Sequence, residues 1–171
     1  KINWINLGLP SETVSGLSEE GHADGAFPRP DLHERLDRIF GSIQPDLVFV
    51  NYGMNDGIYL PFDSTRFKKY AEGMLWLDTK IQAIGASALF LTPPIYDPIK
   101  GEAYSNTLDQ YAAWLIDQEK ESSWEVIDIH FPMKDYLESK RAIDPEFYLA
   151  KDGVHPSPIG HWLITRAILD Y

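Results

Sequence analysis

The stretch Asp152-Gly153-Val154-His155-Pro156 carries a combination of residues that could do chemistry. An acid three positions before a histidine, on a loop marked by Gly and Pro, can accept a hydrogen bond from the imidazole Nδ1. The Nε2 atom then faces outward and can act as a general base. The purely structural alternative is that Asp152-Gly153 forms a turn and that His155 caps a helix or packs against its neighbours. The spacing alone leaves both interpretations open, so the other loops must decide between them.

A second candidate is Gly53-Met54-Asn55-Asp56-Gly57, which directly follows an apolar run. Glycines let the backbone turn sharply and approach a ligand closely. The amide of Asn55 can donate a hydrogen bond to a developing oxyanion. The alternative is an ordinary Asn-Asp-Gly turn.

The third candidate loop runs from Asn6 to Thr13 and is rich in small and polar residues. Its backbone N–H groups, including that of Ser11, could form a second set of oxyanion donors. Its hydroxyl groups are better explained as partners for the backbone of the loop itself.

The elements that must position these loops alternate along the chain. Short β-prone or apolar runs predict strands over residues 2–7, 47–52, 88–92 and 124–129. Helical spacing predicts helices over about 31–42, 64–84, 105–121, 131–140 and 158–171. Such alternation is typical of parallel βαβ units in a three-layer α/β/α sandwich, and 171 residues fit one domain. Ligand sites in these folds lie at the carboxyl ends of the strands.

Composition limits the classes of partner. A net charge of −11 argues against nucleic acid, because binding phosphate requires a basic surface. Without cysteine there is no disulfide, thiol nucleophile or thiolate metal site. No apolar run reaches the roughly 18 residues of a membrane span. Residues 1–171 contain no signal peptide, so a secreted or periplasmic location would require one upstream.

No cofactor or metal is predicted. The histidines lack the close spacing of a zinc site, and the aspartates do not form a calcium loop. Four histidines receive structural or solvent-exposed interpretations: His22, His33, His130 and His161.

The three loops, in this order, resemble those of the SGNH or GDSL-type hydrolases over nearly the whole chain. The phrases that carry the likeness are Gly-Met-Asn-Asp-Gly-Ile-Tyr, Leu-Thr-Pro-Pro and Asp-Gly-Val-His-Pro. The resemblance implies a flavodoxin-like parallel sheet and a serine esterase acting on a short-chain acyl or carbohydrate O-acetyl ester. It also implies His155 as base, Asp152 as its orienting acid, and Asn55 with the Ser11 N–H as oxyanion hole.

Two departures from the family pattern stand out. Ser11 occupies a position that is normally glycine, where a glycine-only backbone conformation would be strained. The Gly-Asp-Ser block is absent from residues 1–171. We therefore expect the nucleophilic serine, with the first strand of the sheet, to lie upstream of Lys1. Ser11 and Ser157 are less favoured substitutes for it.

Rival interpretations remain at this stage. A non-catalytic, carbohydrate-binding relative of the same fold would bind a ligand without hydrolysing it. A nucleotide-binding doubly wound domain is disfavoured, because the sequence has neither a Gly-x-Gly-x-x-Gly nor a Walker loop. A metal-dependent phosphoesterase is weaker still. Arg29 and Tyr59 are further candidates for shaping the acyl or leaving-group side of a site, and the sequence gives no oligomeric state.

Overall fold

The computed structural model describes residues 2–171 and has an α/β architecture built on a parallel sheet. The three strands are β1 (Leu47–Val50), β2 (Ser87–Leu91) and β3 (Glu125–Ile127), and they lie side by side in chain order. Phe49 is in register with Leu89, which is in register with Glu125. The carboxyl ends of all three strands therefore meet at one edge, as expected for parallel βαβ units.

Within residues 2–171, five α-helices connect or flank the strands. They are α1 (Leu36–Ser42), α2 (Ser64–Ala83), α3 (Glu102–Glu121), α4 (His130–Arg141) and α5 (Pro158–Asp170). Two short 3₁₀ helices precede them, η1 (His22–Gly25) and η2 (Leu32–Glu34). The sequence predicted α2, α4 and α5 to within a residue or two, whereas α3 begins three residues earlier than expected.

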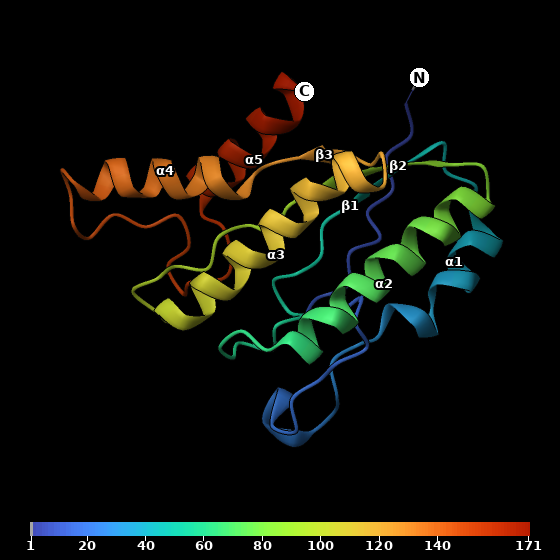
Figure 1. The fold of residues 1–171 in the computed structure, drawn as a ribbon, viewed down its shortest axis with the longest axis horizontal. Helices are drawn as coiled ribbons and strands as arrows, with labels where there is room; N and C mark the ends of the chain where they lie inside the picture. Colours follow the sequence, from blue (N-terminus) through green and yellow to red (C-terminus); the bar gives the residue numbers. More distant parts are fainter. Residues whose placement is uncertain (1) are drawn as a thin grey trace.

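Helices cover both faces of the sheet, giving three layers. Figure 1 shows α2 and α3 side by side on one face, where the Tyr70 and Tyr111 rings stack with their centroids 4.6 Å apart. On the other face, Ile164 and Ile168 of α5 pack against a buried cluster that contains Leu89. Neighbouring residues of a strand point to opposite faces of the sheet. Phe90 therefore packs on the face covered by α2 and α3, and Leu89 packs on the face covered by α5.

The strand predicted over residues 2–7 is wrong. Within residues 2–171 this segment pairs with no strand, and Ile2 and Trp4 are 75% and 74% exposed. The Trp4 ring lies 5.8 Å from that of Phe49, so the segment passes beside β1 without joining it. Strand propensity reflects the preference of side chains for a pleated, half-buried surface. A strand also requires a neighbouring strand whose backbone groups accept and donate its hydrogen bonds.

The helix predicted over residues 31–42 is interrupted. Asp31 does cap a helix, since its side chain accepts the N–H of His33, but that helix is only η2. Arg35 then leaves the helical conformation with φ −122°, and its guanidinium binds the buried carboxylate of Glu12. The α-helix α1 begins only at Leu36.

The loop that carries Asn55 leaves the carboxyl edge of the sheet after β1, and the loop that contains Leu-Thr-Pro-Pro leaves it after β2. The loop before α5 reaches the same edge, because the Asp97 N–H donates to the Gly153 carbonyl at 3.1 Å. Across residues 2–171, no helix combines the length and the apolar character that crossing a membrane requires.

Candidate active site

Asp152 and His155 form a hydrogen-bonded pair. The His155 Nδ1 lies 2.7 Å from one Asp152 carboxylate oxygen, and the other oxygen accepts the N–H groups of Val154 and His155 at 2.9 Å each. Gly153 makes this tight turn possible with φ 92°, a left-handed conformation that favours glycine. The His155 side chain is 84% exposed. This leaves the imidazole Nε2 available to a substrate.

Hydrogen bonds set the charge of the acid. The bond from His155 holds the pKa of Asp152 below its ordinary value, and the backbone N–H groups of His155 and Val154 lower it further. Asp152 is therefore a carboxylate at neutral pH and accepts a proton-bearing Nδ1. This arrangement fixes the tautomer in which Nε2 is the basic nitrogen.

Hydrogen bonds of Ser157 hold the end of this loop. Ser157 ends the loop by capping α5, with its hydroxyl accepting the Gly160 N–H at 3.3 Å. Its own N–H donates to the Leu149 carbonyl at 2.6 Å. These contacts give Ser157 a structural role, which weakens it further as a substitute nucleophile.

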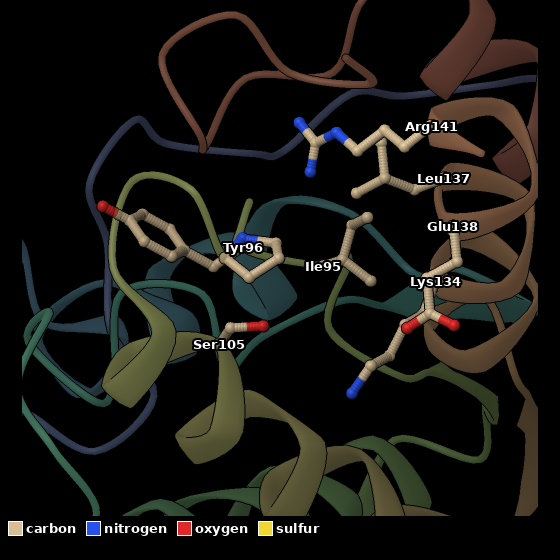
Figure 2. A pocket seen from close by; sticks show the side chains of 8 residues that line it. Ile95, Tyr96, Ser105, Lys134, Leu137, Glu138 and Arg141 are labelled. Carbon is tan, nitrogen blue, oxygen red and sulfur yellow. The ribbon is translucent and has the colours of Figure 1, made fainter. Parts of the chain in front are cut away.

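Arg141 of α4 braces the loop after β2, which in turn contacts Gly153. The Arg141 guanidinium binds both carboxylate oxygens of Asp97, at 2.9 and 2.7 Å. Arg141 lines a cavity of about 270 Å³. Figure 2 shows Arg141, Lys134 and Leu137 on the α4 side of this cavity, opposite Ile95 and Tyr96 of the loop. The cavity contains none of the predicted site residues, and Lys134 on its wall is already paired with Asp109. We regard this cavity as part of the supporting scaffold.

Asn55 lies on the loop after β1, and both the oxygen and the nitrogen of its amide are hydrogen-bonded. The Oδ1 atom accepts two hydrogen bonds, from the Arg29 Nη1 at 3.2 Å and from the Tyr59 hydroxyl at 3.0 Å. The Nδ2 atom donates to the Glu12 carbonyl at 3.3 Å. One N–H of the amide therefore reaches toward the segment around Ser11, and the second is left to donate elsewhere.

The segment around Ser11 is fastened to the same loop by a buried carboxylate. Asp56 is fully buried, and its Oδ1 accepts the N–H groups of Val14 and Ser15 at 2.9 Å each. Its Oδ2 accepts the Gly53 N–H at 2.9 Å. One side chain thus ties two loops that are about 40 positions apart in the sequence.

Ser11 has φ 64°, the left-handed conformation expected where the family has glycine. Its carbonyl accepts a hydrogen bond from the Arg29 Nη1 at 3.3 Å, the same atom that binds Asn55. The structure therefore brings Ser11 and Asn55 together.

A line of aromatic contacts connects this pair with the Asp152–His155 loop. A Cβ atom placed on Gly153 would lie 3.3 Å from the Tyr96 ring, whose centroid is 5.9 Å from that of Tyr59. The Tyr59 hydroxyl in turn binds Asn55. Burial raises the pKa of Tyr59, Arg29 opposes this rise, and the nearby carboxylate of Asp152 adds to it. All four predicted residues thus belong to loops that meet at one edge of the sheet.

Sequence reasoning missed several residues in this region. Glu19 binds Arg29 through two contacts of 2.6 Å, and Tyr96 bridges the loops. In the sequence, Glu19 lies in a long irregular segment and Tyr96 lies two positions after Pro93-Pro94. Neither position indicates a contact with the site. His130 is buried between the Pro93 carbonyl and Asp109, consistent with its structural interpretation.

No cluster of three or more metal-ligating side chains occurs in the part of the chain that the structure describes.

Known proteins agree with this architecture. The model of the GDSL-like Lipase/Acylhydrolase family matches residues 2–163. The chain belongs to this family. No curated protein matches it.

Among solved structures, Axe2, an acetylxylan esterase from Geobacillus stearothermophilus, is similar with a TM-score of 0.64 and 22% identity over 84% of this chain and 70% of that one. LAE5, an α/β hydrolase from the metagenome of Lake Arreo in Spain, has a TM-score of 0.63 and 21% identity over the same shares. BT4096, a gut microbial diltiazem-metabolizing enzyme, has a TM-score of 0.71 and 19% identity, over 81% of this chain and 35% of that one. At these identities the likeness establishes the fold, and the family membership supports ester hydrolysis as the class of reaction.

Proposed function

We propose that this protein is a serine ester hydrolase that acts on a short-chain acyl or carbohydrate O-acetyl ester. The attacking serine is that of a Gly-Asp-Ser block, which residues 1–171 do not contain and which we place upstream of them. The choice of an acetylated carbohydrate is supported by the fold shared with Axe2, an acetylxylan esterase.

In this proposal the serine Oγ attacks the ester carbonyl while the His155 Nε2 takes the hydroxyl proton. The Asn55 amide and the Ser11 N–H stabilise the tetrahedral oxyanion. His155 then returns the proton to the departing alcohol, and water, activated in the same way, releases the acid. Asp152 keeps the imidazole in the required tautomer throughout.

The observation that carries the proposal is the 2.7 Å contact between the His155 Nδ1 and the Asp152 carboxylate, on a loop that adjoins the Tyr59–Asn55 pair. An exposed imidazole with an oriented tautomer is the geometry of a general base.

The test is hydrolysis of p-nitrophenyl acetate by the full-length protein, including the residues upstream of Lys1. His155→Ala should abolish turnover. His161→Ala removes a different exposed histidine, which lies on α5, and should leave turnover unchanged. Activity should also survive EDTA, which separates this mechanism from a metal-dependent one. Near-normal turnover by His155→Ala would reject the proposal.

A non-catalytic, carbohydrate-binding relative of the same fold is the second candidate. It predicts that the full-length protein binds acetylated oligosaccharides without releasing acetate.

A further inference from the structure

We propose that Arg29 and Tyr59 are positioning residues, which lock the Asn55 amide in the orientation that an oxyanion requires. The inference rests on the proposed function and extends it, because it assigns a task to two residues that are not expected to touch the reacting atoms. It also gives Arg29 and Tyr59 a different role from the pocket lining that the sequence suggested.

The chemistry of the donors fixes the amide. A guanidinium can only donate hydrogen bonds, so the atom of Asn55 that faces the Arg29 Nη1 at 3.2 Å must be the oxygen. The Tyr59 hydroxyl donates to the same oxygen at 3.0 Å. Rotating the amide by half a turn would set N–H groups against the guanidinium. Both amide protons therefore stay on the side away from Arg29.

Arg29 is itself held rigidly. Its side chain is only 5% exposed, and its Nε and Nη2 bind the two carboxylate oxygens of Glu19 at 2.6 Å each. The guanidinium also lies 5.3 Å from the centre of the Tyr59 ring. Bidentate Arg–carboxylate pairs fix geometry well, so the donor that faces Asn55 has little freedom to move.

The same Nη1 contacts both halves of the proposed oxyanion hole. It donates to the Ser11 carbonyl at 3.3 Å as well as to Asn55, and so sets the spacing between these two residues. A charged donor on the amide oxygen also strengthens the N–H groups of that amide as donors, because chained hydrogen bonds polarise one another.

The experiment is a double-mutant cycle in the full-length enzyme with p-nitrophenyl acetate. Arg29→Met should lower kcat by about 10- to 100-fold and change KM by less than about twofold, since losing one oxyanion donor entirely costs about 10²–10³. Tyr59→Phe keeps the ring but removes its hydroxyl, and should lower kcat by about 3- to 10-fold, a smaller share of that loss. Arg166→Met is the matched control and should have no effect, because it removes only exposed contacts on α5, with Asp170 and with the Trp162 ring.

The cycle is closed in the background of Asn55→Ala. There Tyr59→Phe should not reduce kcat any further, and Arg29→Met should cost less than in the wild type, since only its bond to the Ser11 carbonyl is then lost. If Arg29→Met does not fold, as judged by its thermal melt, the Tyr59→Phe cycle decides alone. A loss that is equal in both backgrounds would make these residues structural braces and overturn the inference.

Two more outcomes separate the inference from the proposed function. Unchanged kcat in both variants, with His155→Ala inactive and Asn55→Ala slowed by about 10²–10³, overturns the inference alone. Near-normal turnover by Asn55→Ala overturns the inference together with the oxyanion role of that residue.

Discussion

Removing the carboxylate of Asp56 should loosen the two loops that carry Ser11 and Asn55. Asp56→Ala leaves two buried N–H groups and one partly buried N–H group without their acceptor, at about 1–2 kcal/mol each, or about 3–6 kcal/mol together. Relief from burying a charged group offsets part of this, so we expect a net loss of about 2–4 kcal/mol. For a chain of this size that corresponds to a fall in Tm of about 4–16 °C.

The pH dependence of this loss has a definite sign. Burial raises the pKa of Asp56 above its ordinary 3.8, and the N–H groups of Ser15, Gly53 and Val14 oppose the rise only in part. The folded protein then holds a proton that the unfolded chain has already lost, so this group's contribution to stability falls as pH rises above 3.8. The difference in unfolding free energy between wild type and Asp56→Ala should therefore decrease as pH rises from 3.8 toward neutral.

The assay is thermal and urea unfolding followed by circular dichroism. Asp56→Asn keeps an acceptor for Val14 and Ser15 but sets an NH₂ group against the Gly53 N–H, so it should cost about 1–2 kcal/mol. Asp63→Asn is the matched control. Within residues 2–171 the Asp63 side chain accepts one hydrogen bond, from the Arg66 N–H at the start of α2, and asparagine caps helices equally well. A melting temperature for Asp56→Ala within about 2 °C of wild type would refute the reasoning.

Two further predictions concern the proposed site. Asp152→Asn should lower kcat for p-nitrophenyl acetate by up to about 10⁴, by analogy with triads that lose the orienting carboxylate. Because the folded pKa of Asp152 is lowered, its stabilising effect should be present above pH 3.8 and disappear as pH falls further, so the urea midpoints of wild type and Asp152→Asn should converge in acid. Ser11→Gly should keep kcat, because the N–H remains, and raise stability by up to about 1 kcal/mol, since a left-handed residue with a side chain is strained. Lower stability of Ser11→Gly in urea unfolding would contradict that account of φ 64°.

Sequence patterns predicted most of the architecture because the information was local. The apolar run of β1 and the helical spacing of α2 each lie within one element, and both elements formed where expected. The strand at residues 2–7 was wrong because pairing depends on a neighbour that the pattern cannot report. The break at Arg35 likewise accompanies a contact with Glu12, 23 positions away.

The candidate site divides in the same way. Asp152 and His155 are three positions apart, so their spacing carried real information about the contact, although their catalytic roles stay predictions. Arg29 contacts Asn55 across 26 positions and Tyr96 reaches Gly153 across the fold. No single-sequence pattern encodes such pairs, because they follow from the way the loops pack.

The most direct test of the central claim is a crystal structure of the full-length protein after reaction with an organophosphate ester, a mimic of the tetrahedral intermediate. The account predicts a phosphorus bonded to a serine upstream of Lys1, with one phosphoryl oxygen about 2.7–3.1 Å from both the Asn55 Nδ2 and the Ser11 N. His155 should lie next to the bonded serine oxygen. A phosphoryl oxygen turned away from Asn55, or a protein that does not react, would contradict it.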